Sequence, residues 1–368
     1  MVASQRRIRR TLDPLVTQAA ATPGANRYRK CFPALAHLWV LLLHVLWGSL
    51  SLRITHARLT ADVRWWQHWG MTGWISFSQL ARSSSSRPQA CAETLLAAVV
   101  ERVRRQPVAN PLWFKLRRVV VLDSTFLRLS AKTSAWSVHG GAAPGARLQS
   151  MLELGSQIPH SLRLSLADSN DYTALWDLDL TAWRGWTLLV DRGYYGHQQF
   201  ARLRAAGVHV IARFNEQARY RITRQRQLPT GRTPDGDEIL ADYTIELGSP
   251  NNRRGAVISG MRLVASRNAR GIVHWFVTDR HDLSATEIVQ LYRKRWQIEL
   301  FFRWLKRQLG MIRPLGKSRS AIWLMILMVM IVALLVLLLE VDRPRALSRI
   351  AWLHHVAMLL LPGTVEDG

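Results

Sequence analysis

The feature that most constrains the fold is a long stretch without helix breakers at residues 284–310, SATEIVQLYRKRWQIELFFRWLKRQLG. Its first residues predict a capping box, in which Ser284 can accept a hydrogen bond from the backbone N–H of Glu287 and the Glu287 side chain can reach back to the backbone of Ser284. No proline or glycine follows before Gly310. The stretch therefore predicts one continuous helix of about seven turns.

Four side chains share one face of this predicted helix: Tyr292, Arg295, Glu299 and Lys306. At about 100° per residue they fall within roughly 60° of arc and extend over about 21 Å. In an arbitrary helix such a face would most often be a solvated surface. Its spacing, however, resembles the YREK signature of bacterial insertion-sequence transposases of the DDE type. Those enzymes are similar in fold to ribonuclease H and retroviral integrases, so the resemblance implies two aspartates at the ends of apolar strands upstream.

Two apolar runs upstream do end in aspartate. The run VVVL is apolar on both faces, which is typical of a central buried strand, and it ends at Asp123. The run WTLLV ends at Asp191, and Gly193 and Tyr195 follow at offsets that resemble the family's second-carboxylate motif. With Glu299, these two aspartates are the carboxylates that the resemblance implies for catalysis. Four other aspartates stand in a loop or helix-cap context: Asp168, Asp171, Asp177 and Asp179.

The middle of the chain places strands before helices. GARLQSMLELG and IPHSLRLSLA predict two strands joined at a Gly155 turn, a helix follows near 172–182, and HQQFARLRAAG and VHVIARF predict a helix and a strand. We expect an α/β fold with a ribonuclease-H-like (retroviral-integrase-like) catalytic core, interrupted by a β-rich insertion and preceded by an N-terminal all-α domain. The expected divisions are a helical region at 1–110, a first half of the core at 111–215, the insertion at 216–282, a second half at 283–345 and a tail at 346–368.

The first 110 residues predict accessory helices. The apolar segment 33–50 carries His37 and His44 on one helical face, and without nearby cysteines or paired carboxylates such histidines are more typical of a core or surface than of a metal site. Breaks at Gly70 and Gly73 and a turn at 83–88 divide the remainder of this region into short helices. A helix-turn-helix that grips DNA and a purely structural helical layer fit this pattern equally well.

The chain between the second aspartate and the YREK stretch is longer than a minimal core needs. Residues 216–282 alternate strand-like runs with turn signals and are rich in arginine. Hairpin-forming members of the resembled family carry a β-rich insertion here, with a tryptophan that stacks against a flipped base. The resemblance assigns this role to Trp275, and a place in a strand core is an equally good interpretation. We also expect DNA contacts from Arg253, Arg254 and Arg303.

The segment 322–339, IWLMILMVMIVALLVLLL, is uncharged and long enough to cross a bilayer on length alone. A buried core helix is the better interpretation, because a single span here would tether a strongly basic enzyme with a very short tail. The resembled family also places a very apolar helix just after its signature helix. We therefore expect no membrane partner.

The net charge of the chain limits the classes of binding partner that we expect. With 50 Lys and Arg against 25 Asp and Glu, the net charge is +25, and chains this basic most often bind a polyanion, with nucleic acid the leading candidate. A hydrophobic content of 48% excludes a disordered protein. The two cysteines, Cys31 and Cys91, can form neither a thiolate zinc site nor a disulfide framework. We expect a reducing bacterial cytoplasm, close to the nucleoid, since no secretion signal follows the N-terminal arginines.

Phosphodiester chemistry explains why three carboxylates are needed together. Carboxylate oxygens suit Mg²⁺, or Mn²⁺ in its place. Two such ions about 3.5–4 Å apart can activate the attacking oxygen and stabilise the leaving one. The expected metal ligands are Asp123, Asp191 and Glu299. The other three signature residues are expected to hold the phosphates of a DNA end.

The resemblance implies a cut-and-paste DNA transposase that acts on double-stranded DNA, both terminal inverted repeats and target, as a homodimer in the synaptic complex. Water would free a 3′-OH at the transposon end, this 3′-OH would form a hairpin with the opposite strand, and the reopened ends would join target DNA. Two alternatives keep nucleic acid as the partner: a ribonuclease-H-like nuclease without strand transfer, and a non-catalytic DNA-binding relic. A third alternative, a basic membrane-associated protein, leaves the signature unexplained.

Overall fold

The structure, a computed structural model, describes residues 2–27, 31–71, 73–106, 118–129, 135–137, 144–166, 175–229, 232–249, 257–311, 313, 315–340, 343–344 and 346–360. The chain forms two compact units. Unit 1 comprises Met1–Pro107, Leu129–Trp136 and Phe301–Gly368, and unit 2 comprises Val108–Arg128 and Ser137–Leu300. Each unit is therefore assembled from segments that lie far apart in the sequence.

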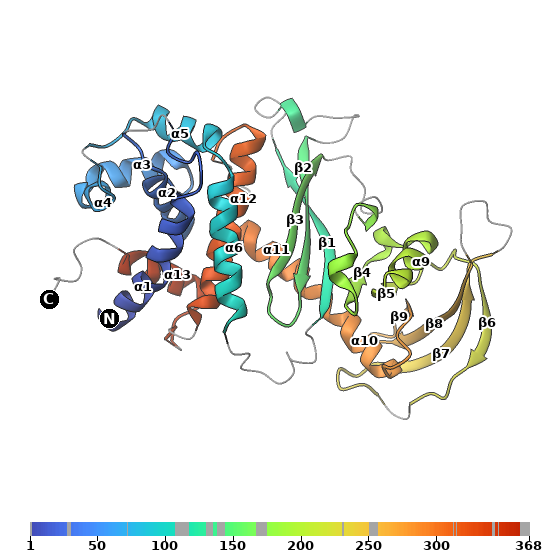
Figure 1. The fold of residues 1–368 in the computed structure, drawn as a ribbon. Coiled ribbons are helices and arrows are strands. Elements are labelled where there is room, and N and C mark those ends of the chain that lie inside the picture. The colour runs from blue at the N-terminus through green and yellow to red at the C-terminus, as the bar shows by residue number, and fades with distance from the viewer. Residues whose placement is uncertain are drawn as a thin grey trace. The chain divides into compact units, whose positions relative to one another are not determined.

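Unit 1 is built from helices. They are α1 (Val2–Ala20), α2 (Ala34–Leu46), α3 (Leu52–Ala61), α4 (Val63–His68), α5 (Phe77–Ser86), α6 (Ala90–Arg104), α12 (Arg319–Leu338) and α13 (Arg349–Leu359). Figure 1 shows α12 running beside α6, and α12 also packs against α2 and α5. A segment near the end of the chain thus completes a core that is begun by the first hundred residues.

The helix α12 is apolar around its whole circumference. Its length and composition would suit a membrane span, but 89% of its 18-residue apolar window is buried inside the structure. A helix that is hydrophobic on every side needs a covering partner on every side, and its three neighbours in unit 1 provide this cover. The burial favours the predicted core helix over a span.

The two histidines of α2 are core residues. The Nε2 atom of His37 lies 3.2 Å from the Ser84 hydroxyl, and Nδ1 of His44 lies 2.7 Å from the Thr55 hydroxyl. Burial lowers the pKa of His44 to about 4, so its ring is neutral near pH 7. Each buried ring has a polar partner, as the core interpretation requires.

Unit 2 is built on one nine-stranded sheet. Its strands are β1 (Val119–Arg128), β2 (Gly145–Glu153), β3 (Pro159–Leu166), β4 (Thr187–Val190), β5 (His209–Arg213), β6 (Tyr220–Gln225), β7 (Glu238–Leu247), β8 (Ile258–Arg267) and β9 (Val273–Thr278). The spatial order is β3-β2-β1-β4-β5-β9-β8-β7-β6. Strands β1, β4 and β5 are parallel, whereas β2, β3 and the strands from β6 to β9 enter through antiparallel pairings.

The pairing of β5 with β9 makes the 216–282 segment a continuation of the sheet. Ile211 pairs with Thr278 and Arg213 with Phe276, so β9, β8, β7 and β6 extend the parallel strands outward. The helices α9 (His197–Ala205) and α10 (Ala285–Lys294) pack on this sheet. Because β9 leads into α10, the extended edge also sets where α10 begins.

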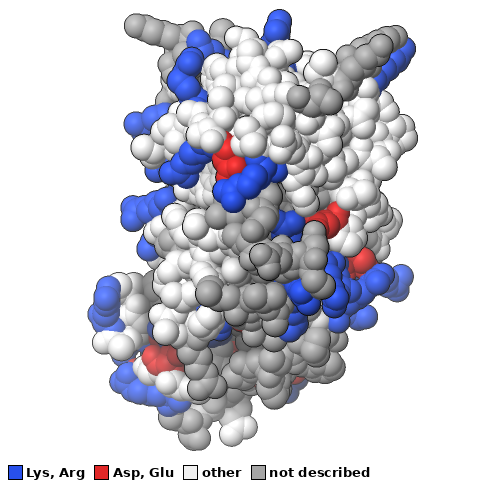
Figure 2. All heavy atoms as spheres, turned by 90° about the vertical axis from the view of Figure 1, so that its left-hand side faces the viewer, with Lys and Arg blue, Asp and Glu red and all other residues white. Residues whose placement is uncertain are grey.

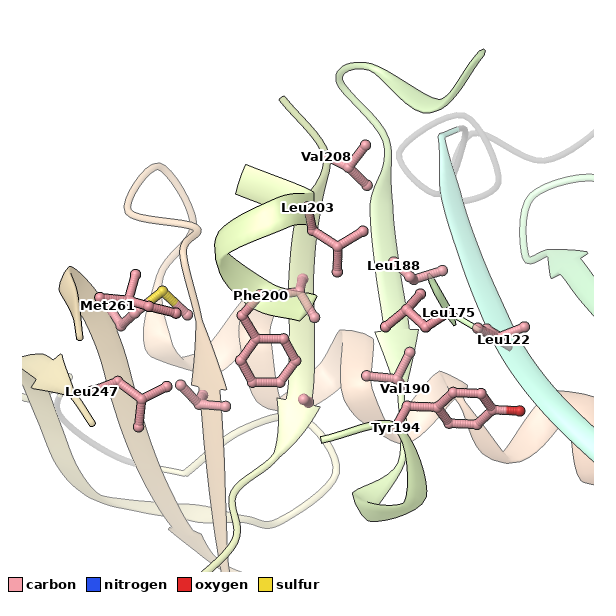
Figure 3. Packing of buried hydrophobic residues seen from close by; sticks show 14 of the residues in the cluster. Leu122, Leu175, Leu188, Val190, Tyr194, Phe200, Leu203, Val208, Leu247 and Met261 are labelled. Atoms are coloured by element: carbon pink, nitrogen blue, oxygen red, sulfur yellow. The ribbon is translucent and has the colours of Figure 1, made fainter. Parts of the chain in front are cut away.

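The hydrophobic core of unit 2 connects the parallel strands with the extension. Figure 3 shows Phe200 and Leu203 on α9, beside Leu188 and Val190 on β4. Met261 on β8 belongs to the same buried cluster. This shared core makes the strands from β6 to β9 part of one packed body with the parallel strands.

Three expectations about local structure were wrong in detail. The strand β1 does not end at Asp123 but continues to Arg128, because its residues keep pairing with β2. Residues 83–86 are helical and belong to α5, which ends only before Arg87 and Pro88. The predicted continuous helix after Ser284 is divided at Arg295 into α10 and α11 (Trp296–Arg307).

A methionine pair tests the role of α12. Met330 on α12 is fully buried, whereas Met358 on α13 is 57% exposed. We expect Met330→Ala to lower the free energy of unfolding by about 2–5 kcal/mol, because it leaves a cavity in the core of unit 1. Met358→Ala should change it by less than about 0.5 kcal/mol. Urea titration followed by tryptophan fluorescence, without detergent, measures both, and equal midpoints for the two variants would contradict a packed α12.

Candidate active site

The parallel pairing of β1 with β4 brings two aspartates to equivalent positions. Val121 pairs with Leu189, and Asp123 and Asp191 each follow two residues later in their chains. Residues two apart on a strand lie on the same face. The two carboxylates therefore lie side by side on one face of the sheet, Asp123 in the middle of β1 and Asp191 directly after the end of β4.

Asp191 is oriented by the turn that follows it. It is the N-cap of a short 3₁₀ helix at Arg192–Tyr194, and its Oδ1 accepts a hydrogen bond of 2.8 Å from the backbone N–H of Gly193. A charge-assisted bond of this kind holds one carboxylate oxygen in place and leaves the other available. This is a physical role for the glycine that the sequence motif pointed to.

The break at Arg295 shapes the third side of the site. The N–H of Arg295 donates to the Tyr292 carbonyl at 2.9 Å, and the N–H of Ile298 donates to the Arg295 carbonyl at 3.1 Å. These i to i−3 bonds form a tight turn of the 3₁₀ type, which separates α10 from α11. Glu299 lies in the first turn of α11, so the turn sets the direction from which its carboxylate approaches.

The guanidinium of Arg295 bridges two of the three carboxylates. Its Nη1 lies 3.3 Å from Oδ2 of Asp123, and its Nη2 lies 2.6 Å from Oε1 of Glu299. The side chains of Arg295 and Asp123 are only 16% and 13% exposed. At this burial a charge pair is weakly screened by water. Arg295 is therefore the cation that neutralises the acidic cluster.

This neutralisation is incomplete at Asp123. Burial is the main cause that raises the pKa of Asp123 to about 6; the Ser124 N–H and Arg295 oppose this shift, and the nearby negative charges of Asp191 and Glu299 add to it. Desolvation and like charges both disfavour the ionised form of a carboxyl group. The site thus holds more negative charge than Arg295 alone balances.

The donor set suits a divalent metal ion in its chemistry. Carboxylate oxygens are the ligands that Mg²⁺ and Mn²⁺ prefer, and the raised pKa of Asp123 indicates an unmet demand for positive charge. Within the described part of the chain, however, no three His, Cys, Asp or Glu side chains converge closely enough to hold one ion. The Arg295 guanidinium occupies Oδ2 of Asp123 and Oε1 of Glu299, two of the carboxylate oxygens that would hold an ion.

Tyr292 lies beside a cavity next to this cluster. Its ring is 4.7 Å from that of Phe276 and 6.0 Å from the Arg295 guanidinium, and burial raises the pKa of its hydroxyl. The cavity has a volume of about 180 Å³, and its lining includes Phe276, Tyr292, Arg295 and Trp296. Sequence reasoning did not single out Phe276 or Trp296, because only the folding of β9 against α10 brings them together.

Trp275 stands next to Phe276 on β9. Neighbouring residues of a strand point to opposite faces, and Phe276 faces Tyr292. Trp275 is partly buried against the hydrophobic core of unit 2 and does not belong to the cavity lining beside Tyr292. Its stacking role stays a prediction.

The other predicted contacts are spread along the chain. Lys306 lies on α11 seven residues, or about two turns, after Glu299, and burial lowers the pKa of its ammonium. Arg303 is an exposed residue of the same helix. Arg253 and Arg254 lie outside the described residues, as do the aspartates at 168 and 171.

The two remaining loop aspartates are engaged locally. Asp177 forms an exposed ion pair with Arg163, and Asp179 accepts hydrogen bonds from Thr181. Neither is among the groups whose charge acts on Asp123.

Comparison with known proteins identifies the family to which this chain belongs. The family model described as "Transposase DDE domain" matches residues 114–335, a range that includes Asp123, Asp191 and the four residues Tyr292, Arg295, Glu299 and Lys306. The match covers more than half of the chain. The chain belongs to the DDE transposase domain family. This family consists of enzymes that cleave DNA and transfer its strands, and its members generally use divalent metal ions.

Two relatives carry transposase names. The chain is 29% identical over 255 residues to y4zB of Sinorhizobium fredii (strain NBRC 101917 / NGR234), a transposase by its given name, and the match covers 68% of each protein. It is 24% identical over 253 residues to a protein of Geobacillus stearothermophilus that is named as the transposase for insertion sequence element IS5377. That match covers 67% of this chain and 63% of the relative.

A solved structure shows a weak overall likeness. The piggyBac transposase, in a cryo-EM structure of its synaptic complex with hairpin DNA, superimposes with a TM-score of 0.47 at 9% sequence identity. The superposition covers 88% of this chain and 69% of the other.

The raised pKa of Asp123 predicts a gain in stability when its charge is removed. Between about pH 4 and pH 6 the folded DDE domain holds a proton that the unfolded chain has released, so stability falls as the pH rises through this window. Without divalent metal at pH 8, we expect Asp123→Asn to raise the free energy of unfolding by roughly 1–3 kcal/mol, and to have little effect at pH 4.

Urea denaturation at the two pH values measures this difference. Asp177→Asn is the matched control, since it removes a carboxylate from an exposed ion pair and should change stability by less than about 0.5 kcal/mol. If Asp123→Asn is less stable than the wild type at pH 8, the attraction of Arg295 outweighs burial and like-charge repulsion.

Proposed function

We propose that this DDE transposase catalyses cut-and-paste movement of an insertion sequence. The reaction would comprise metal-dependent hydrolysis at the element's ends, hairpin formation on each end and strand transfer into target DNA. The observation that carries the proposal is the Arg295 guanidinium bound to both Asp123 and Glu299, with Asp191 beside them in the β1–β4 register. A ribonuclease-H-like core, with the strands from β6 to β9 as its insertion, is the fold assignment that agrees best with this sheet.

Asp123, Asp191 and Glu299 would hold the divalent ions, Mg²⁺ or Mn²⁺. When bound, such ions activate an attacking oxygen and stabilise a leaving one. The residues themselves supply the negative charge and the geometry. Gly193 fixes one oxygen of Asp191, and Asp123 must lose its proton to act as a ligand. Binding of the ions should therefore strengthen as the pH rises through about 6.

Arg295 links DNA binding to the release of carboxylate oxygens. A guanidinium binds phosphate as well as it binds carboxylate, often through two parallel hydrogen bonds. A DNA phosphate that captures Arg295 would free Oδ2 of Asp123 and Oε1 of Glu299, the two atoms it now holds. Tyr292, with its ring beside this guanidinium, and Lys306 on α11 are the further proposed phosphate contacts.

Hairpin formation requires a base to leave the duplex. Stacking on an aromatic ring is worth about 1–3 kcal/mol per base. The mostly polar lining of the cavity beside Tyr292 includes the aromatic rings of Phe276, Tyr292 and Trp296. Of these, Trp296 is 50% exposed, which favours it over Trp275 as the ring that receives the base. This choice rests on access to solvent and on proximity to Tyr292.

The partner is proposed to be double-stranded DNA, both the terminal inverted repeats and the target, bound by a homodimer. The net charge of +25 supports a polyanionic partner. Figure 2 shows Lys and Arg side chains spread widely over one face of the molecule, with few Asp and Glu among them. Such a surface attracts DNA from many directions before a specific contact forms.

The test uses purified protein, Mg²⁺ or Mn²⁺, and DNA carrying the inverted repeats that flank the gene. Denaturing gels would follow nicks, hairpins and joined products. We expect the wild type to produce all three and Glu299→Gln to bind the DNA without cutting it, a loss of at least about 10³-fold in rate, because a metal ligand is removed. Glu101→Gln is the control, since it neutralises a glutamate in an exposed α6 ion pair.

Each alternative predicts its own gel. Cleavage that ignores the repeat boundary would indicate a nuclease without strand transfer. Binding by the wild type without cleavage in either metal would indicate a DNA-binding relic. Either result would overturn the proposed reaction.

The exposed Trp296 ring in the cavity beside Tyr292 leads to a separate prediction about the hairpin step. Trp296→Ala should leave the first nick within about twofold of the wild type and lower hairpin formation by roughly tenfold, the effect of losing one stacking contact. Trp275→Ala removes a ring next to Phe276 but outside the cavity lining. It should lower hairpin formation less than Trp296→Ala does, once circular dichroism has shown that both variants are folded. The opposite order would return the stacking role to Trp275.

A further inference from the structure

A groove of about 700 Å³ lies in unit 2, away from the carboxylates. It lies between the edge strand β6, its neighbour β7 and the N-terminal end of α10. Its lining includes Arg224, Arg226, Asp242, Arg262 and His281. None of these residues has a role in the proposed catalytic steps. The groove is therefore a feature that needs its own explanation.

The negative charge on the floor of the groove is fully paired. Asp242 is the one acidic side chain among the described lining residues, and both of its oxygens are taken by Arg262, at 2.8 Å from Nε and 2.7 Å from Nη2. This pair is almost fully buried, and Nη1 of Arg262 donates to the carbonyls of Arg280 and Leu283. The floor is thus neutral and rigid.

The rim of the groove carries two arginines whose charge is not balanced by a carboxylate. Arg224 is exposed, and its side chain has no hydrogen bond or ion pair with any residue that the structure describes. Arg226 is half-buried, and its Nη1 lies 3.0 Å from Nδ1 of His281. Because Nε2 of His281 faces the Gly260 carbonyl at 2.8 Å, that nitrogen carries the proton and Nδ1 accepts from Arg226. The neutral histidine therefore orients the Arg226 guanidinium without neutralising its charge.

The lining indicates the class of ligand. The groove has arginine guanidinium groups, which bind phosphate through paired hydrogen bonds, but its described lining includes no Phe, Tyr or Trp on which a base could stack. A nucleotide would leave its base without a partner. A sugar–phosphate backbone, which presents charge and no exposed base, fits better.

The position of the groove relates it to the carboxylate site through α10. Ser284 lines the groove at one end of this helix, and Arg295 follows the other end. Eleven residues of helix span about 16 Å. Since B-DNA advances about 3.4 Å per phosphate on one strand, this corresponds to roughly five base pairs.

We propose that this groove binds a phosphodiester of the DNA backbone about five base pairs from the scissile bond, through Arg224 and Arg226. The inference rests on the proposed function, since it assumes that DNA is held at Arg295. It adds a second anchoring point on and just after β6, in the groove that also meets the N-terminal end of α10, and two anchoring points fix the direction of the duplex across the carboxylates.

The first experiment measures the affinity for end DNA by fluorescence anisotropy over a range of salt concentrations. Arg224→Ala and Arg226→Ala should each weaken binding by roughly tenfold and reduce the slope of log K against log salt by about one. Arg224→Lys should restore part of the affinity, since it keeps the charge. Arg270→Ala removes the same charge from an exposed turn outside the groove and should stay within about twofold.

The second experiment identifies the phosphate. End DNA is prepared with a single neutral methylphosphonate at each position in turn. One position about five base pairs from the cleavage site should weaken binding by the wild type and have no further effect on Arg224→Ala. If no position behaves in this way, or if inorganic phosphate alone binds the groove while the methylphosphonates have no effect, the inference is overturned.

The outcomes separate the groove from the proposed function. If Arg224→Ala and Arg226→Ala bind and cut like the wild type, the groove inference fails while the transposase reaction stands. If the wild type itself neither binds nor cuts end DNA, the proposed function fails and the groove inference fails with it. Matching thermal melting curves exclude misfolding as the cause of weaker binding.

Discussion

Repulsion between carboxylates in a partly buried site is the constraint on which the rest of unit 2 depends. Asp123 and Asp191 are forced together by the parallel pairing of β1 with β4, and Glu299 is added from α11. Such a group of charges is tolerable only with a cation in contact, and Arg295 is that cation. The break between α10 and α11 occurs at this residue. Arg295 is therefore both the point where the helix is divided and the cation that contacts the carboxylates.

Sequence reasoning succeeded where the determining interactions are local. The capping box at Ser284 depends on a residue three positions away, and the acid that follows β4 depends on the apolar run before it. The break at Arg295 could not be predicted, because no glycine or proline marks it in the sequence. The residue that holds this arginine, Asp123, lies 172 residues earlier. The pairing of β5 with β9, and therefore the cavity at Phe276, likewise depends on contacts between distant segments that no local pattern encodes.

The strands from β6 to β9 influence the carboxylate site because they extend the same sheet that carries the aspartates. Arg262 ties this extension to the turn before α10 through the Arg280 and Leu283 carbonyls. The start of α10 is thereby set by the extension, and its end is set by the carboxylates. One short helix thus relates two charged surfaces, and its length determines which parts of a duplex can meet both at once.

The discontinuous assembly of unit 1 has a consequence for how the protein is made. The helices α2 and α6 are packed against α12, yet more than two hundred residues are translated between the end of α6 and the start of α12. At about 5–20 residues per second, the first helices wait for roughly 10–40 s with their apolar faces uncovered. A ribosome that stops early leaves this core open, so a truncated product of the gene would be a substrate for chaperones and proteases rather than a smaller enzyme.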